Sequence, residues 1–279
     1  MQLDLEVIGR TIPGPDFVYD WKTCALYALA IGASPSNLDY VWEGSAAFKV
    51  HPSFAVIPVH GIIMDALMKV RADFRTLVHG EQTIRLHRPF EKEGTLHSTG
   101  KISAVYDKGK AAVVLIDTET RDAKGDLLTE TSWSIFCRGQ GGFGGEVGPT
   151  PKSIEALPDA PPSLVIRAET RPEQALLYRL CGDLNPIHVD AALATKVGFE
   201  RPILHGLCTY GSAVRALVDG LCGGDVSSVR RISARFSGVV YPGDTIDLRV
   251  VPSTSPGTHL LEARVGERSV LSNGVIELG

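Results

Sequence analysis

The sequence predicts an α+β fold in which one structural unit occurs twice in tandem. Two pairs of similar segments indicate the repeat: residues 23–33 are similar to residues 173–183, and residues 58–62 are similar to residues 203–207. In each copy, a helical pattern is followed by several strand-like patterns. This order is typical of helices packed on an antiparallel sheet, and 279 residues accommodate two such units of ordinary size.

Helices are expected at equivalent places in the two copies. In the second copy, Thr170 and Glu173 have the spacing of a capping box before residues 173–180, which are good helix formers. Gly182 should end this helix, because glycine readily adopts the backbone conformation that closes helices. The similar residues 23–31 then predict a helix in the first copy that ends at Gly32.

Two further helices are expected after Gly182. A short one spans residues 191–197, with Asp190 as its N-cap and Gly198 at its end. A long one begins at His205-Gly206. Apolar side chains recur along it at three- and four-residue intervals, forming one stripe that a sheet can wrap around: Leu207, Tyr210, Val214, Leu217, Val218 and Leu221.

Strands are predicted where β-branched, aromatic and alternating residues dominate. The first copy has such patterns over residues 82–88, 96–106, 111–118 and 127–137, and the second copy has them over residues 230–236, 245–251, 258–265 and 269–277. Glycine, proline and asparagine signals separate or interrupt the second set. Each copy therefore supplies enough strands for one antiparallel sheet.

The two copies are separated by a segment rich in glycine and proline. We predict an N-terminal half over residues 1–137, a linker or mobile surface loop over residues 138–163, and a C-terminal half over residues 164–279. The glycine run does not have the pattern of a phosphate-binding loop, because it opens no helix and no Lys-Ser/Thr pair completes it.

The composition excludes several classes of function. A hydrophobic content of 44%, a charged content of 22% and a net charge of −4 indicate a globular protein that binds neither nucleic acid nor membrane. The five cysteines have no metal-binding spacing and are expected to be reduced in a cytoplasmic protein. The first residues lack the pattern of a secretion signal. The location would be peroxisomal if the source were a eukaryote, although the last three residues are not a peroxisomal Ser-Lys-Leu signal.

The loop between Gly182 and Asp190 carries the strongest candidate for catalysis. Asp183 and His188 lie five residues apart, and Pro186 disfavours helical backbone between them. A carboxylate and an imidazole held by a rigid loop can act as a general acid/base pair. Taken singly, each residue has a structural alternative, since Asp after Gly is common in turns.

The whole segment from Tyr178 to His188 resembles the hydratase 2 motif of the R-specific enoyl-CoA hydratases. These enzymes are the MaoC-like branch of the hot-dog fold, and the matching positions are Tyr178, Leu180, Cys181, Gly182, Asp183, Asn185, Pro186, Ile187 and His188. Residues 54–58, 236–244 and 271–276 are also similar to this family, so the resemblance covers nearly the whole chain. It is greatest to the two-domain members, which include the hydratase part of the peroxisomal multifunctional enzyme type 2.

The resemblance implies a tandem, or double, hot-dog fold with one active site. Asp183 and His188 would be the catalytic acid and base, in an order that the sequence leaves open. An N–H of Gly206 would form the oxyanion hole, although the glycine could equally be a flexible helix start. Asn185 would orient water or the loop, or would be a simple turn residue. The first copy has Ala33 at the place of Asp183 and Leu38 at the place of His188, so it lacks the pair.

Further residues are implied in substrate binding. His79 and Gly80 would contact CoA from the other half, and Lys108 would meet a CoA phosphate. Phe236 would lie along the ligand. The motif residues Leu184, Pro186 and Ile187 would border the substrate. The structural alternatives are a strand start for His79 and Gly80, a solvated turn for Lys108 and a core aromatic for Phe236.

The expected function is that of a hydro-lyase, a (3R)-specific 2-enoyl-CoA hydratase for medium or long chains. It would need no cofactor and no metal, because CoA is part of the acyl-CoA substrate, and the family implies a homodimer. The alternatives are a 3-hydroxyacyl-ACP or -CoA dehydratase of fatty-acid synthesis, a hot-dog thioesterase, and a non-catalytic acyl-CoA-binding module. In the inactive N-terminal half of the two-domain members, a loosened central region accommodates long acyl chains.

Overall fold

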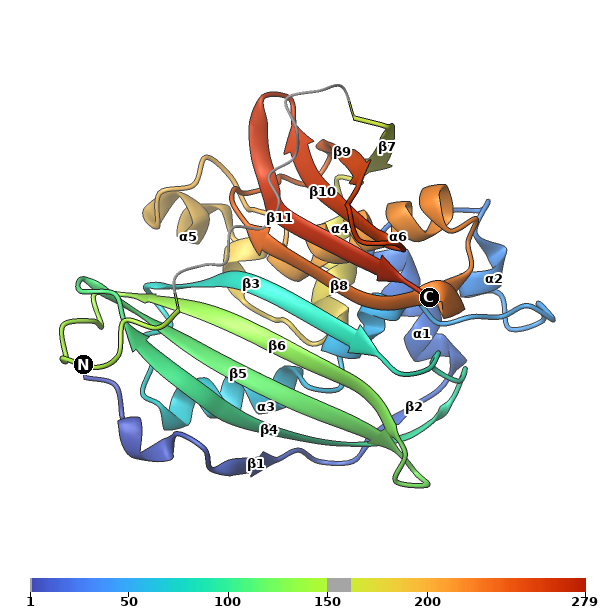
Figure 1. Cartoon of the computed structure of the whole chain (residues 1–279). Helices are drawn as coiled ribbons and strands as arrows, with labels where there is room; N and C mark the ends of the chain where they lie inside the picture. Colours follow the sequence, from blue (N-terminus) through green and yellow to red (C-terminus); the bar gives the residue numbers. More distant parts are fainter. Residues whose placement is uncertain (1, 150–161) are drawn as a thin grey trace.

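One continuous antiparallel sheet organises the computed structural model, which describes residues 2–149 and 162–279 (Figure 1). The first half contributes, in spatial order, β1 (Thr11–Pro13), β4 (Gly94–Asp107), β5 (Ala111–Asp122), β6 (Leu127–Arg138) and β3 (Leu77–Leu86), while β2 (Phe17–Tyr19) pairs with β4. The second half contributes β8 (Val229–Phe236), β11 (Arg268–Leu278), β10 (Thr258–Val265), β9 (Thr245–Pro252) and β7 (Leu164–Glu169). With β2 set aside and each half counted from its outer edge towards the junction, the strands of both halves follow the order first, third, fourth, fifth, second along the chain. The predicted tandem hot-dog fold is therefore confirmed.

The two halves join through a strand pair between β3 and β8. Their register places Ile84 opposite Ile232, and both side chains are buried. Edge-to-edge pairing of hot-dog sheets thus occurs here between two halves of one chain. The homodimer stays a prediction.

The main helices lie on one face of this curved sheet (Figure 1). They are α1 (Trp21–Ala30), α3 (His60–Lys69), α4 (Gln174–Tyr178) and α6 (Gly206–Leu221), and the shorter α2 (Leu38–Val41) and α5 (Ala191–Lys196) lie in loops. The predicted stripe of α6 is buried from Leu207 to Val218 and half-buried at Leu221. None of the helices in the described ranges is long and apolar enough to cross a membrane.

Local signals fixed several helix ends as expected. Gly32 and Gly182 both have positive φ values, 92° and 125°, at equivalent places in the two halves. The Asp190 carboxylate accepts hydrogen bonds from two backbone N–H groups at the start of α5, and Gly198 follows its end with φ 97°. The predicted capping box at Thr170 and Glu173 was wrong, because no side chain caps the start of α4. The Thr170 hydroxyl instead donates to the carbonyl of Asp244 at 2.7 Å.

The glycine-rich segment is hydrogen-bonded to Asp107 where the structure describes it. The carboxylate of Asp107 accepts hydrogen bonds from the N–H groups of Gly142 and Gly144, both at 2.8 Å, and its own N–H donates to the Glu146 carbonyl. These backbone donors, Gly142 first, lower the pKa of Asp107. These bonds connect the described part of the segment to the end of β4, and the linker or mobile surface loop over residues 138–163 stays a prediction. Residues 150–161 lie outside the described residues.

A polar cavity of about 610 Å³ lies at the junction of the two halves, where Ala33 occupies the place that Asp183 has in the second copy. Two arginines of the second half close it against the C-terminal end of α1. Arg171 donates to the carbonyl of Leu29 at 2.8 Å, and Arg215 donates to the carbonyl of Ile31 at 3.1 Å. The last carbonyls of a helix have no partner within it and carry a partial negative charge, so the two guanidinium groups clamp the halves together.

Replacing Arg215 by Met is expected to lower Tm by a few degrees. Its side chain is 13% exposed and also pairs with Asp219, and a hydrogen bond to a charged group contributes ~1.5–3 kcal/mol. Arg167→Met is the matched control, because Arg167 borders the same cavity but is 75% exposed and pairs with Asp247 at the surface. Equal losses of Tm in the two variants, followed by circular dichroism, would contradict the clamp.

Candidate active site

The loop that carries Asp183 is braced by its own backbone. Oδ1 of Asp183 accepts a hydrogen bond from the N–H of Asn185 at 3.1 Å. Oδ1 of Asn185 accepts one from the N–H of Ile187 at 3.2 Å and so caps the short 3-10 helix Pro186–His188. Asn185 therefore shapes the loop, and its predicted role in orienting water remains a prediction.

His188 is held in one tautomer at the end of this loop. It is buried, and its Nδ1–H donates to the carbonyl of Ile203 at 2.8 Å. A carbonyl only accepts, so Nδ1 carries the proton and Nε2 has a free lone pair in the neutral ring. Burial lowers the pKa of His188, although the Ile203 carbonyl and Asp183 act in the opposite direction. The imidazole is thus a neutral proton acceptor.

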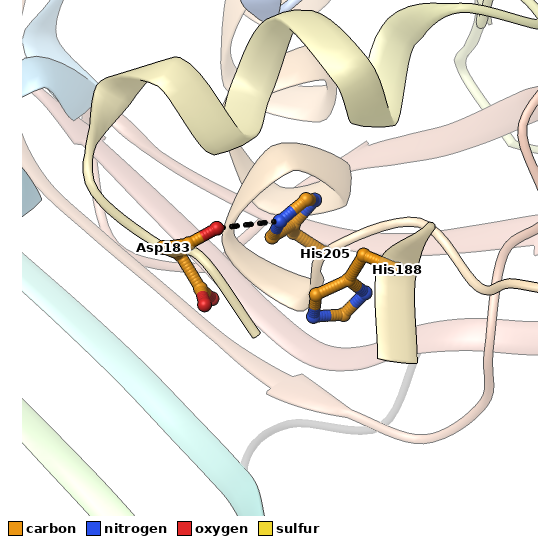
Figure 2. A group of neighbouring side chains, drawn as sticks. All are labelled: Asp183, His188 and His205. Atoms are coloured by element: carbon orange, nitrogen blue, oxygen red, sulfur yellow. Dashed lines mark hydrogen bonds between the residues drawn. The ribbon is translucent and has the colours of Figure 1, made fainter. Parts of the chain in front are cut away.

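His205 is a third member of the site, and the sequence analysis missed its role. Figure 2 shows its ring next to that of His188 and linked by a hydrogen bond to Asp183. Its Nε2–H donates to the backbone carbonyl of Asp183 at 3.1 Å, and its ring stacks on that of His188 with centroids 3.7 Å apart. The available signal was its place in the repeat, since His60 precedes a glycine at the equivalent point of the first copy.

The three side chains bring potential ligand atoms within 4.8 Å of one another. A water molecule that makes two hydrogen bonds of ordinary length can bridge two such groups, Asp183 and Nε2 of His188. Asp, His and His are also metal-ligating types. However, Nε2 of His205 donates to the Asp183 carbonyl, so the neutral ring keeps a lone pair only on Nδ1. The predicted absence of a metal stays a prediction.

Gly206 begins α6 directly after His205. As the first helical residue, its N–H has no partner within the helix and lies at the positive end of the helix dipole. The residue is exposed, and a Cβ placed on it would meet the ring of Phe236 at 3.4 Å. A hydrogen-bond donor and the aromatic ring predicted to line the substrate are therefore neighbours.

The first half reaches this site through β3. The ring of His79 lies 4.6 Å from that of Phe236 and stacks on Trp133 at 4.9 Å. Gly80 forms a bulge in β3, because the register between β3 and β6 shifts between His79 and Glu81, and such bulges re-aim side chains. Burial lowers the pKa of His79 to about 4, with a smaller opposing effect of Asp183. Both halves thus form the site.

The remaining predicted residues have less defined places. Leu184, Pro186 and Ile187 lie in the loop between Gly182 and Asp190, which we call the acid/base loop after its predicted role. Leu184 and Pro186 are exposed, and Ile187 is half-buried. The Lys108 ammonium donates to the Val147 carbonyl and lies 5.8 Å from the ring centroid of Tyr106. No contact in the described part of the chain brings Lys108 to the acid/base loop, so its predicted role with a phosphate remains a prediction.

An apolar cavity of about 210 Å³ opens beside the loop. Its lining comes from both halves and includes Phe17, Leu26, Phe54, Ile57, Leu180 and Gly182. Gly182 precedes Asp183 in the chain, so the cavity begins next to the acid/base pair. Such a lining suits an unbranched apolar group.

Two family models match successive parts of the chain. A model described as the MFE-2 hydratase 2 N-terminal domain matches residues 17–139. A model described as a MaoC-like domain matches residues 153–268, which contain the acid/base loop and Gly206.

Individual proteins are similar over most of the chain. A probable enoyl-CoA hydratase 2 of Dictyostelium discoideum is 36% identical, over 99% of this chain and 96% of its own. The peroxisomal multifunctional enzyme type 2 of Mus musculus is 38% identical over 86% of this chain, which spans only 34% of that longer enzyme. The crystal structure of a MaoC-like dehydratase from Phytophthora capsici, 29% identical, superimposes with a TM-score of 0.87 over 99% of this chain and 98% of the other.

Proposed function

The chain belongs to the enoyl-CoA hydratase 2 family of MaoC-like hydro-lyases, and on that basis we propose that it adds water to trans-2-enoyl-CoA to give (3R)-3-hydroxyacyl-CoA. The observation that carries the proposal is the pairing of Asp183 with a neutral His188 whose Nε2 is free. Both groups can accept a hydrogen bond from the same water molecule, and such a water is oriented to attack a neighbouring carbon.

Nε2 of His188 takes one proton from the water as its oxygen attacks C3. Asp183 accepts a hydrogen bond from the other hydrogen, which stays on the new hydroxyl. The His188 imidazolium then returns its proton to C2. Oxygen and proton arrive from the same side, so the addition is syn, and both catalytic groups end in their starting protonation states. In this proposal His188 is the base, and Asp183 orients the water.

Negative charge develops on the thioester oxygen during this step. In the proposed reaction the free N–H of Gly206, at the start of α6, donates to that oxygen, and such a donor stabilises the enolate more than the uncharged thioester. Loss of one such donor typically costs ~10²–10³ in rate. The reaction as proposed uses the chain's own groups, so the absence of cofactor and metal stays part of the proposal.

The direct test is hydration of trans-2-decenoyl-CoA, followed as loss of the enoyl absorbance, with chiral analysis of the product and a parallel assay for free thiol. We expect the (3R)-alcohol and no thiol release. Thiol release with C2–C3 unchanged would identify a thioesterase instead, and tight binding without turnover would identify an acyl-CoA-binding module.

A 3-hydroxyacyl dehydratase is the second candidate, because the solved relative from Phytophthora capsici is described as a MaoC-like dehydratase. The same site catalyses both directions, so the two functions differ in carrier and pathway. Comparing kcat/KM for CoA and ACP thioesters of one acyl chain distinguishes them. A preference for CoA is expected. The cytoplasmic location also remains a prediction.

The acyl chain is proposed to occupy the apolar cavity next to Gly182. Two features support a medium or long chain. The cavity is lined largely by the first half, and the central helix of that half is shorter, since α3 has 10 residues where α6 has 16. The thioester would then lie over the acid/base loop with its alkyl tail between the halves.

Substitution of Leu26 is expected to change the preferred chain length. Leu26→Trp fills the cavity and should lower kcat/KM for decenoyl-CoA ~10-fold or more while crotonyl-CoA is little affected, and Leu26→Ala should favour longer chains. Leu176→Trp is the control, since Leu176 lies on α4 with 55% exposure outside the cavity lining. Unchanged chain-length profiles in both Leu26 variants would place the acyl chain elsewhere.

A further inference from the structure

Two histidines connect the acid/base loop to the segment before α6 in a reciprocal way. His188 belongs to the loop and donates to the carbonyl of Ile203 in the segment. His205 belongs to the segment and donates to the carbonyl of Asp183 in the loop. Their rings stack with an interplanar angle of 27° (Figure 2). We refer to this arrangement of His188 and His205 as the histidine clasp.

We infer that His205 is a positioning residue of the reaction, which fixes the Asp183–His188 pair relative to the N–H of Gly206. This inference rests on the proposed function. Three observations carry it: the 3.1 Å hydrogen bond to Asp183, the 3.7 Å stack on His188, and the position of His205 as the N-cap residue directly before Gly206. One side chain thus touches both members of the acid/base pair, and its backbone begins the helix that supplies the oxyanion donor.

The surroundings of His205 keep it in the donor tautomer. Its side chain is buried, and Nδ1 has no hydrogen-bond partner among the described residues. A proton on Nδ1 would therefore be buried without an acceptor, which is costly. Burial lowers the pKa of His205, and the neighbouring His188 and Arg179 add to this effect, while Asp183 opposes it. The ring consequently stays neutral and donates from Nε2.

The first half shows the same scaffold without the clasp. His60 stands at the start of α3 before Gly61, as His205 stands before Gly206. The partners are missing, because Ala33 replaces Asp183 and Leu38 replaces His188. The two reciprocal bonds therefore occur in the half that carries the acid/base pair.

Two substitutions separate the hydrogen bond from the shape of the ring. His205→Phe keeps a flat ring but removes the donor, and we expect kcat to fall about 10²-fold with KM nearly unchanged, because a displacement of ~1 Å at a catalytic group costs that much. His205→Gln restores an N–H donor at a similar reach and should recover most of kcat. The split between kcat and KM, together with this rescue, separates positioning from a purely structural role.

His51→Phe is the matched control. His51 is also a buried histidine with one ring nitrogen unpaired, and it lies in the first half, where it hydrogen-bonds Ser53. It should lower Tm and leave kcat unchanged. The inference is overturned if His205→Phe retains kcat within about threefold, or if His205→Gln is as slow as His205→Phe while its Tm equals that of the wild type.

A measurement without turnover keeps this inference distinct from the proposed function. Nitrogen-15 NMR of the wild-type histidine side chains should show His205 as the neutral Nε2–H tautomer from pH 8 down to about pH 5.5, below the ordinary imidazole value of ~6.5. An Nδ1–H tautomer would overturn the clasp even in an active enzyme. A wild type that hydrates no enoyl thioester would instead overturn the proposed function.

Discussion

Asp183→Asn is expected to lower kcat for enoyl-CoA hydration ~10²–10⁴-fold while Tm stays close to that of the wild type. The amide keeps the shape of the side chain, and its oxygen can still accept the hydrogen bond from the N–H of Asn185, so the loop keeps its conformation. The amide carries no negative charge. It therefore lacks the charge that holds the attacking water and that faces the His188 imidazolium. Initial rates and thermal unfolding of the purified variant measure both quantities.

Asp190→Asn provides a closely matched control for Asp183→Asn. Asp190 lies seven residues further along, and its carboxylate caps α5 through the N–H groups of Ala192 and Leu193. Asparagine caps helices about as well as aspartate, so this variant should keep its activity. Similar rates for Asp183→Asn and wild type, or equal losses in both variants, would show that Asp183 is not catalytic.

His188→Asn is expected to lower kcat by a similar ~10²–10⁴-fold and to remove the acidic limb of the pH profile. The Nδ2–H group of asparagine can replace the Nδ1–H donor to the Ile203 carbonyl, so the loop keeps its tie to that segment. What asparagine lacks is a basic nitrogen in the place of Nε2. The variant therefore separates the base from the anchor.

The pH dependence of the wild type follows from the direction of the His188 shift. The base must be neutral to accept a proton, and burial lowers the pKa of His188 below its ordinary value. The fraction of neutral imidazole thus stays high as the pH falls through ~6.5, the usual value, and decreases only at lower pH. We expect kcat/KM, which reports the ionisation of the free enzyme, to be flat above pH 6.5 with its acidic inflection below it. An inflection at or above 6.5, or the same limb in His188→Asn, would exclude His188 as the base.

Local signals were sufficient to predict the acid/base loop. The positive φ of Gly182, the restriction before Pro186 and the cap at Asp190 are all properties of short sequences, and the structure shows each of them. The repeat was likewise visible in the chain, and it led to two equivalent sheets around helices. The strand-rich segments from β3 to β6 and from β8 to β11 were expected within a few residues of their observed bounds, except that β3 begins five residues earlier.

Features that depend on contacts between distant segments were not predictable from one sequence. In the sequence, His205 marked only the start of a helix. Its bond to Asp183 could not be predicted, because the two residues are 22 positions apart in the chain. The short edge strands β1, β2 and β7 carry weak patterns and form because longer strands offer them free edges. The composition of the glycine-rich segment predicted a linker or mobile surface loop, and it gave no sign that the carboxylate of Asp107, more than 30 positions away, binds its backbone.

The most direct test of the proposed reaction is hydration of trans-2-decenoyl-CoA in D2O by the wild type and by Asp183→Asn, with NMR analysis of the product at C2 and C3. We expect the wild type to give a (3R)-hydroxyl with one deuterium at C2 on the same face, and Asp183→Asn to give almost no product in the same time. Anti addition, a (3S)-alcohol, or equal rates for the two proteins would contradict syn hydration by the Asp183–His188 pair.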